Sequence, residues 1–489
     1  MRMTLAVAAA LLVASAAPAA AQGGPRVAIE SGELRGAEQD GALVFRGIPY
    51  AAPPLGELRW QPPQPVQPWA GVREAAERAP ACPQVSEGWN AWEAENWGED
   101  CLTLDIRTPA LSGKRPVMVW IHGGSNRAGS SSGPADSDMS AQGVVHVGIQ
   151  YRLGLLGFLS HPQLSGEGGG ASGNYALMDQ VAALAWVRDN IARFGGDPDN
   201  VTIYGESAGS QDVSLLLAAP AAQGLFRGAI LQSGTPGFGL PYRSLEQAEE
   251  LGETLGPVAD LRGLPVEELL EAQASFGDPA SHGPAMAFLR TTVDGKVLPQ
   301  APDRLIAQHE PKPVIIGTDK VEFGSEAESP AELEALAGAW FGGRGSEALA
   351  AYRAEAADPR RGPLATRLVS DAVFHCPADR LADLLAENGW AVWRYEFDVG
   401  EDGGLTRHAY EIGFIFERKP VGGGAHMQDY WAALAIAGDP NADTPLGADR
   451  PLWERWEPGT PRQIAFGEAT TQMERGKPRA ELCRFTEHF

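Results

Sequence analysis

The hexapeptide YGESAG at residues 204–209 follows a strand-like apolar run, Val201–Tyr204, and precedes a helix-compatible run, Ser210–Ala219. A G-x-S-x-G pattern between a strand and a helix is typical of a nucleophile elbow, in which a sharp turn projects a serine side chain out of a sheet. The close approach of chain segments at such a turn requires small residues, here Gly205, Ala208 and Gly209. The pattern predicts that Ser207 is a nucleophile. The alternative is a glycine-rich turn whose serine has no chemical role.

The N-terminal segment has the features of a secretory leader rather than of a folded element. Arg2 supplies a positive charge, Leu5–Ala17 is an apolar run, and Ala19–Ala21 forms a cleavage site of the A-x-A type. The apolar run is too short for a membrane span. We therefore expect residues 1–21 to be a signal peptide and the protein to be exported to the periplasm or the medium. Residues 22–489 are expected to form a single domain.

The composition predicts a globular protein that binds neither nucleic acid nor membranes. Of the 489 residues, 44% are hydrophobic and 21% are charged, which excludes a disordered chain. The net charge of −24 repels phosphate backbones and anionic lipids. No clustered Cys and His spacing indicates a metal site, and we expect neither a metal nor a cofactor. A small molecule is the expected partner, and the oligomeric state stays open.

An even number of cysteines behind a leader predicts disulfide bonds in an oxidising compartment. The four cysteines allow three pairings. The local choice is Cys82–Cys101, which would close a loop in the N-terminal region. The remaining pair, Cys376–Cys483, would then tie the C-terminal tail to the body of the protein.

Apolar runs and helix-compatible stretches alternate along the chain, as in a mostly parallel, doubly wound α/β sheet. Pro116–Ile121 is typical of a strand buried on both faces, and Asp179–Phe194 has the apolar spacing of a helix. The stretch from about Ser244 to Gln308 is richer in helix formers and is expected to be a helical insertion. The other expected strands are Val27–Leu34, Leu43–Tyr50, Val144–Tyr151, Val201–Tyr204, Gly228–Gln232, Val314–Gly317 and Trp390–Phe397.

A serine nucleophile needs donors for the oxyanion, a base, and an acid that orients the base. Two consecutive glycines, Gly123 and Gly124, follow the strand that ends at Ile121. Such glycines let the backbone approach a ligand closely and direct its N–H groups inward. The N–H of Ala208 is the expected second contribution to this oxyanion site.

The acid and the base are expected after Ser207 in chain order. Asp319 and Glu322 both follow the strand at Val314–Gly317, and the pattern alone leaves the choice between them open. The histidines further along the chain are His375, His408, His426 and His488. The position of His408 in a loop after a predicted strand favours it as the base. His426 opens an amphipathic helix and is expected to cap or pack there.

Several motifs together resemble the type-B carboxylesterases, the family that includes cholinesterases and bacterial para-nitrobenzyl esterases. The resemblance extends from about Val27 to Cys483, over nearly the whole mature chain. The segments that carry it are Phe45–Ala51, Glu99–Leu102, Trp120–Gly124, Tyr151–Gly154, Asn174–Gln180, Phe194–Pro198, Gly205–Gly209 and Gly438–Asn441. The resemblance implies an α/β-hydrolase fold with helical insertions.

The resemblance also implies a choice among the candidate residues. The family acid lies in a segment like GTNRDEG, with which Gly317–Glu322 aligns, and this selects Glu322 over Asp319. The family histidine lies in H-x-x-E-L-x-Y-V-F, which matches at His408 and not at His426. The family has a disulfide like Cys82–Cys101 and, in cholinesterase-like members, one like Cys376–Cys483. The implied activity is hydrolysis of carboxylic esters through an acyl-enzyme on a Ser207, His408, Glu322 triad.

Three positions depart from the family pattern. Ser125 replaces a glycine or alanine, Asn126 replaces a common aromatic residue, and Phe323 replaces the glycine after the acid. By resemblance the oxyanion donors are the amides of Gly124, Ser125 and Ala208, and a backbone donor survives the change to serine. The departures are expected to affect substrate preference more than catalysis.

The remaining alternatives concern Glu206, the substrate and the class of protein. Glu206 is expected either to favour the imidazolium form of the base or to make a buried structural hydrogen bond. An amidase, a carbamate hydrolase or a lactonase shares the acyl-enzyme step, and a non-catalytic cholinesterase-like binding module shares the fold. Pocket residues are expected from the insertion and from the loops at Asn126–Ser132 and Pro236–Arg243.

Overall fold

The computed structural model describes residues 23–282, 286–356, 358–447 and 449–486. The predicted signal peptide, residues 1–21, and one histidine, His488, lie outside the described residues. Within the described ranges, no helix combines the length and the apolar character that a membrane span requires.

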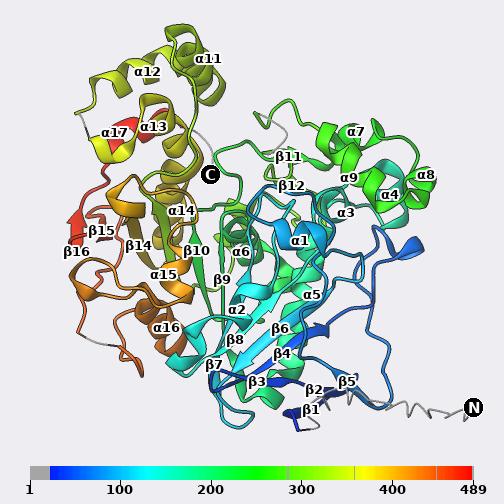
Figure 1. Cartoon of the computed structure of the whole chain (residues 1–489). Coiled ribbons are helices and arrows are strands. Elements are labelled where there is room, and N and C mark those ends of the chain that lie inside the picture. The colour runs from blue at the N-terminus through cyan, green and yellow to red at the C-terminus, as the bar shows by residue number, and fades with distance from the viewer. Residues whose placement is uncertain (1–22, 283–285, 357, 448, 487–489) are drawn as a thin grey trace, which may run out of the picture.

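An 11-stranded sheet forms the centre of the molecule (Figure 1). Its seven central strands run parallel, and the strands toward both edges run antiparallel. The predicted mostly parallel α/β-hydrolase sheet is therefore confirmed. In spatial order the strands are β16 (Thr471–Arg475), β15 (Arg462–Gly467), β14 (Ala391–Asp398), β13 (Pro313–Asp319), β10 (Gly228–Gln232), β9 (Gly196–Glu206), β7 (Arg115–Ile121), β8 (Val145–Ile149), β6 (Thr103–Thr108), β4 (Ala42–Pro49) and β3 (Ala37–Gln39).

Two smaller sheets lie outside the central one. The first contains β1 (Arg26–Ile29), β2 (Gly32–Arg35) and β5 (Val72–Glu74), and the second contains β11 (Arg243–Ser244) and β12 (Thr292–Val293). The single run expected at Val27–Leu34 is therefore a hairpin of two strands. The chain reverses at Glu30 and Ser31, and Gly32 begins the second strand with a φ of 152°, a conformation that L side chains rarely adopt.

Helices cover both faces of the central sheet (Figure 1). The predicted helix at Asp179–Phe194 is α5 (Tyr175–Asn190) with a 3-10 turn after it, and the one at Ser210–Ala219 is α6 (Ala208–Ala218). The other α-helices are α1 (Ala91–Glu95), α2 (Ser132–Ala135), α3 (Gly154–Phe158), α4 (Pro162–Glu167), α7 (Leu245–Glu253), α8 (Val258–Gly263), α9 (Val266–Ser275), α10 (Pro302–Ile306), α11 (Pro330–Phe341), α12 (Gly345–Ala354), α13 (Leu364–Ser370), α14 (Cys376–Glu387), α15 (Ile412–Phe416), α16 (Met427–Ala437) and α17 (Ala480–Cys483).

The strand β7 shows how the sheet holds the helices on its two faces. Because side chains alternate along a strand, Val117, Val119 and Ile121 point to one face and Met118 and Trp120 to the other. The first set packs in the core cluster that contains apolar residues of α5, α6 and α14. The second set packs against α16. The side chains of β7 are therefore buried on both faces of the sheet, which explains the continuous apolar sequence of this strand.

Two groups of helices extend beyond the sheet (Figure 1). One comprises α11, α12, α13 and the C-terminal α17. The other comprises α3, α4 and the helices α7, α8 and α9 of the predicted insertion. The loops that follow the carboxyl ends of β7, β9, β13 and β14 carry Gly124, Ser125, Ser207, Glu322 and His408, as is usual for open α/β sheets.

Candidate active site

Ser207 lies at the turn between β9 and α6, in a backbone conformation that non-glycine residues seldom adopt. Its φ is 54° and its ψ is −125°. A Cβ atom on Gly205 would come within 2.6 Å of the Gly209 backbone, and one on Gly209 would press against the carbonyl oxygen of Ile121. The Ser207 amide donates a hydrogen bond to the Gln232 carbonyl at 2.8 Å. These contacts hold the turn in place and leave no room for larger neighbours.

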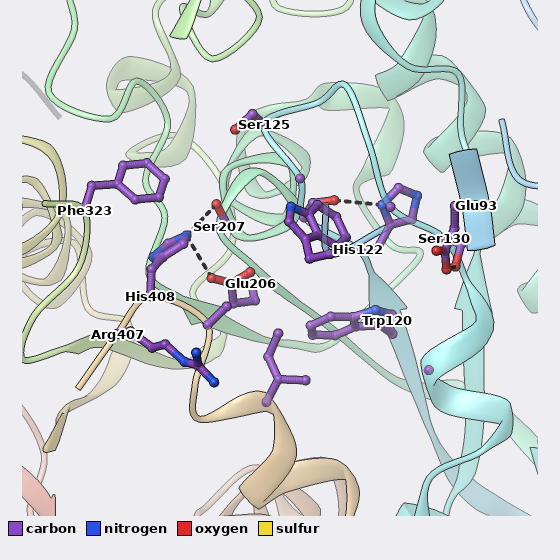
Figure 2. A pocket seen from close by; sticks show the side chains of 17 residues that line it. Glu93, Trp120, His122, Ser125, Ser130, Glu206, Ser207, Phe323, Arg407 and His408 are labelled. Atoms are coloured by element: carbon purple, nitrogen blue, oxygen red, sulfur yellow. Dashed lines mark hydrogen bonds and ion pairs between the residues drawn. The ribbon is translucent and has the colours of Figure 1, made fainter. Parts of the chain in front are cut away.

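The imidazole of His408 bridges the serine and a carboxylate. Its Nε2 atom lies 2.9 Å from Ser207 Oγ (Figure 2), and its Nδ1 atom lies 2.6 Å from Glu322 Oε2. The other oxygen of Glu322 accepts the Asp319 amide at 2.8 Å. The structure therefore brings Ser207, His408 and Glu322 into one hydrogen-bonded chain, and it places Asp319 behind Glu322 instead of against the imidazole.

Glu206 is a second carboxyl group on the same imidazole. Its Oε1 atom is 3.1 Å from His408 Nε2 (Figure 2), and the residue is only 4% exposed. Burial raises the pKa of Glu206, and Glu411 and Glu322 add to the rise, while His408 opposes it. Burial alone would lower the pKa of His408, but the carboxyl groups of Glu206 and Glu322 outweigh this effect and raise it above its usual value. The site therefore favours a positively charged imidazole.

Glu411 lies three residues after His408 and completes a buried cluster of carboxyl groups. Its Oε1 atom accepts a hydrogen bond from Gln232 at 3.0 Å. The Asp319 carboxyl is within hydrogen-bonding reach of Glu411, and burial together with this neighbour raises the pKa of Asp319 well above its usual value. The H-x-x-E spacing in the sequence was the signal that could have identified Glu411 as part of the site.

The loop after β7 lies directly beside the nucleophile. A Cβ atom on Gly123 would be 2.5 Å from the Glu206 carbonyl oxygen and 3.1 Å from Ser207 Cβ, so only glycine fits there. Gly124, Ser125 and Asn126 follow with φ values of 108°, 54° and 57°. The Ala208 amide belongs to the first residue of α6, where helix N–H groups have no partner within the helix. Three backbone amides predicted as oxyanion donors thus come from two segments that meet at Ser207.

Buried hydrogen bonds hold this loop to the nucleophile helix and to the insertion. The Asn126 side chain donates to the Phe288 carbonyl at 3.3 Å and contacts Gln211 of α6 at 3.5 Å. Gln211 in turn donates to the Leu289 carbonyl at 2.6 Å and to the Pro236 carbonyl at 3.2 Å. The polar residue at position 126 therefore links four segments of the chain.

A cavity of about 630 Å³ opens in front of Ser207 (Figure 2). Its walls include two tryptophans, Trp89 and Trp120, and Arg407 is the only basic side chain besides the histidines among the lining residues that the structure describes. Among the described residues, none from Pro236–Arg243 or from the insertion lines this cavity, which differs from our expectation. Of the expected loops, only Asn126–Ser132 contributes. The lining residues are Trp89, Glu93, Trp120, His122, Gly123, Gly124, Ser125, Gly129, Ser130, Gly133, Glu206, Ser207, Phe323, Arg407, His408, Ala409 and Ile412.

The other histidines that the structure describes after β13 make structural contacts. His375 is buried, and its Nδ1 atom lies 2.9 Å from Thr318 Oγ1. His426 stands at the start of α16, where its Nδ1 atom is 2.9 Å from the Arg418 carbonyl oxygen. Its side chain makes no capping hydrogen bond, so it packs there without capping the helix.

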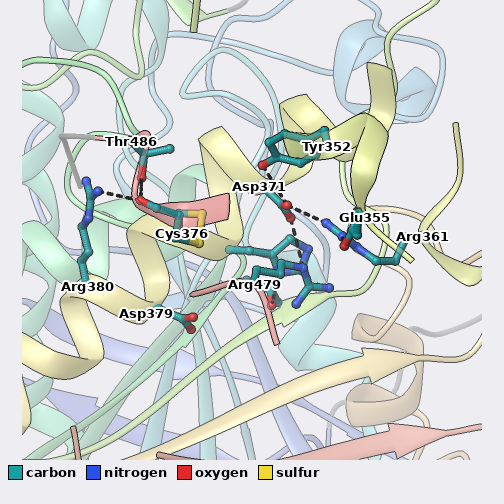
Figure 3. Close-up of a disulfide and its surroundings, with 12 residues drawn as sticks. Tyr352, Glu355, Arg361, Asp371, Cys376, Asp379, Arg380, Arg479 and Thr486 are labelled. Carbon is teal, nitrogen blue, oxygen red and sulfur yellow. Dashed lines mark hydrogen bonds and ion pairs between the residues drawn. A yellow bond between two sulfur atoms is a disulfide. The ribbon is translucent and has the colours of Figure 1, made fainter. Parts of the chain in front are cut away.

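Both predicted cysteine pairs lie at disulfide distance, each with Cα atoms 5.1 Å apart. Cys82–Cys101 closes the loop that contains α1 and brings Trp89 and Glu93 to the cavity. Cys376–Cys483 joins α14 to α17, next to the ion pair between Arg479 and Asp371 (Figure 3). Within the described parts of the chain, no cluster of His, Cys, Asp and Glu is arranged to hold a metal ion.

Comparison with known proteins identifies the family of this chain. The sequence model of the Carboxylesterase family matches residues 23–337, more than half of the chain. The chain belongs to the carboxylesterase family. This carboxylesterase is 34% identical to the fumonisin B1 esterase of Sphingopyxis macrogoltabida, over 91% of this chain and 88% of that protein. It is 35% identical to the para-nitrobenzyl esterase of Bacillus subtilis (strain 168), over 80% of this chain and 82% of that protein.

Solved structures agree with the sequence comparison. A carboxylesterase of Geobacillus stearothermophilus superposes with a TM-score of 0.80 at 34% identity, covering 94% of this chain and 100% of that one. The predicted resemblance and the predicted enzyme class, a serine hydrolase acting on ester bonds, are therefore confirmed.

Proposed function

We propose that the protein hydrolyses carboxylic esters through an acyl-enzyme intermediate on Ser207. The observation that carries the proposal is the bridge made by His408, 2.9 Å from Ser207 Oγ and 2.6 Å from Glu322. In this mechanism the Ser207 oxygen attacks the ester carbonyl while His408 takes its proton. Glu322 orients the imidazole and stabilises its cationic form. His408 then protonates the leaving alcohol. In deacylation, His408 takes a proton from a water molecule that attacks the acyl-enzyme, and it returns this proton to the Ser207 oxygen as the acid is released.

The amides of Gly124, Ser125 and Ala208 are the proposed donors to the oxyanion. Their position beside Ser207 supports this role, because donors fixed in advance stabilise the charge that develops in the transition state. Loss of one such donor typically costs about 3–4 kcal/mol of transition-state stabilisation. Glu206 is proposed to stabilise the imidazolium, since its carboxyl group lies 3.1 Å from His408 Nε2.

The test is hydrolysis of p-nitrophenyl acetate by Ser207→Ala, His408→Ala and His426→Ala. We expect the first two variants to lose activity and the third to keep it, because the His426 side chain contacts the Arg418 carbonyl and not the site. Full activity of Ser207→Ala would overturn the proposal. A fluorophosphonate probe should label Ser207 in the wild type, and absence of an adduct would instead favour a binding module without catalysis.

We also propose that the protein acts outside the cytoplasm. The leader-like sequence at residues 1–21 and the two cysteine pairs support export to an oxidising compartment. Fractionation of cells that express the full chain, followed by N-terminal sequencing, tests this location. Material in the cytoplasm that retains Met1 would contradict it.

A further inference from the structure

Arg407 brings a guanidinium group to the cavity from the position directly before His408. Consecutive Cα atoms are about 3.8 Å apart, so this charge is attached to the backbone right beside the base. The Tyr410 amide donates to the Arg407 carbonyl at 3.1 Å, which fixes the turn that carries both residues. The guanidinium carbon lies 5.0 Å from the centre of the Tyr410 ring. Figure 2 shows the Arg407 side chain on the His408 side of the cavity.

The protein itself makes little use of this charge. The Arg407 side chain is 66% exposed, and its one ion pair among the described residues is with Glu401, which lies 3.5 Å away and is 68% exposed. Ion pairs exposed to this degree contribute little to stability, because solvent screens them. Arg360 contacts the same loop and binds the Asp398 carboxyl at 2.6 Å and the Gly404 carbonyl at 2.7 Å. Arg360 therefore holds the loop, and Arg407 is left to interact with a ligand.

The acidic side chains that the structure describes in the cavity lining have partners within the protein. Glu206 lies 3.1 Å from His408 Nε2, and Glu93 accepts a hydrogen bond from Ser130 at 2.9 Å. Figure 2 shows Glu93 and Arg407 at opposite ends of the lining. An anion bound at Arg407 is therefore kept away from the carboxylate of Glu93.

We infer that this carboxylesterase prefers esters that carry a free carboxylate group, and that Arg407 binds this carboxylate. The inference rests on the proposed acyl-enzyme at Ser207, because that step fixes where the ester carbonyl lies relative to Arg407. A guanidinium group is planar and offers two parallel N–H donors to a carboxylate, a geometry that an ammonium group does not match. Without such a residue, the net charge of −24 would repel an anionic ester from the cavity.

Matched pairs of esters test the preference with purified wild-type protein. In the first pair, p-acetoxybenzoate and p-acetoxybenzamide, the charge is on the leaving group. In the second pair, the mono-p-nitrophenyl esters of adipic acid and adipamic acid, the charge is on the acyl group. In at least one pair, kcat/KM should be higher for the anionic ester, and this excess should shrink as salt is added.

Two outcomes contradict the inference in different ways. If the neutral esters are hydrolysed but the anionic ester is no better in either pair, the inference fails and the proposed function stands. If no ester is hydrolysed and no fluorophosphonate adduct forms, the proposed function fails as well.

Variants of Arg407 give the second arm of the test. Arg407→Gln should lower the anionic-to-neutral ratio of kcat/KM by about tenfold, and the ratio should no longer fall as salt is added. Arg407→Lys keeps the charge without the planar fork and should recover part of the ratio. Glu401→Gln removes the exposed competitor for the guanidinium and should raise the ratio by up to about fivefold.

Arg193→Gln is the matched control, because it makes the same change of charge far from the cavity. Arg193 is exposed in the 3-10 turn that precedes β9, whereas Ser207 follows the other end of that strand. The ratio of kcat/KM should stay at the wild-type value in this variant. An unchanged ratio in folded Arg407→Gln contradicts the inference.

Discussion

The Glu206 carboxyl group lies 3.1 Å from the Nε2 atom of His408, on the same nitrogen that contacts Ser207. Glu322 occupies the other ring nitrogen at 2.6 Å. The imidazole is thus held between two buried carboxyl groups, and the positive charge that it gains when it accepts a proton is stabilised from both sides. The same stabilisation opposes the return of the imidazole to its neutral form.

We predict that the pH profile of kcat/KM reflects the raised pKa of His408. The neutral imidazole is the base, and its raised pKa means that the proton leaves only as the pH rises above the usual histidine value of about 6.5. The acidic limb of kcat/KM should therefore lie above pH 6.5. Glu206→Gln removes one source of the raised pKa, so the limb should move to lower pH. Assays with p-nitrophenyl acetate between pH 5 and pH 9 check both statements, and a limb that moves upward in the variant would contradict the electrostatic role of Glu206.

A second prediction concerns Asp212, a buried carboxyl group on α6. Burial raises its pKa to about 7, and hydrogen bonds from Gln180 and Asn126 offset this only in part. An unfolded chain ionises aspartate near pH 4. The folded protein therefore keeps a proton that the unfolded chain releases, and the free energy of unfolding should fall as the pH rises from about 4 to 7.

Asp212→Asn should remove this pH dependence. Its amide would also have acceptors available, because the side-chain oxygens of Gln180 and Asn126 are buried without a hydrogen-bond partner among the described residues. We expect stabilisation on the order of 2 kcal/mol at pH 8 and little change at pH 4, as measured by urea unfolding. Asp189→Asn, a change at an exposed aspartate, is the control and should give no such difference between the two pH values.

The sequence was sufficient to predict the turn at Ser207 and the close-packed glycines beside it because these features are encoded locally. The elbow at Ser207 needs small residues at fixed offsets, and the loop after β7 needs glycine at position 123, where a Cβ atom would press against the Glu206 carbonyl oxygen. The strand β10 was predicted with both ends correct, since its apolar run is continuous and buried. The choice between Asp319 and Glu322 could not be made from a local pattern. Both are buried carboxyl groups three residues apart, and only their direction relative to His408 distinguishes them.

The aromatic rings packed around His408 and the part of the cavity at Trp89 could not be predicted from local patterns. Phe238, Phe323 and Phe374 are far apart in the chain, and each alone has the character of an ordinary core residue. Trp89 lines the cavity from the loop that the Cys82–Cys101 disulfide closes, a pairing of residues 19 positions apart. The insertion was expected to line the cavity, but Asn126 and Gln211 donate hydrogen bonds to its carbonyl groups, and none of its described residues lines the cavity.

The two disulfides should contribute differently to stability and to activity. Cys376–Cys483 spans 107 residues and Cys82–Cys101 spans 19. The entropy of loop closure then predicts losses of about 5 and about 3 kcal/mol when the pairs are replaced by alanine. Guanidinium unfolding of the two double variants checks the order. Because the shorter loop carries Trp89, which lines the cavity, its variant should also raise KM for p-nitrophenyl acetate. A larger KM effect in the Cys376→Ala, Cys483→Ala variant would contradict this assignment.

Ser125→Gly separates the backbone role of residue 125 from the effect of its side chain. Ser125 has a φ of 54°, a left-handed conformation that costs a non-glycine residue about 1–2 kcal/mol. Glycine keeps the amide donor and relieves the strain, so the variant should melt at a temperature equal to or above that of the wild type. Its kcat/KM for p-nitrophenyl acetate should stay within about threefold, since loss of a true oxyanion donor costs about a hundredfold or more. A hundredfold loss in a folded variant would mean that the serine hydroxyl, and not the amide, acts at this position.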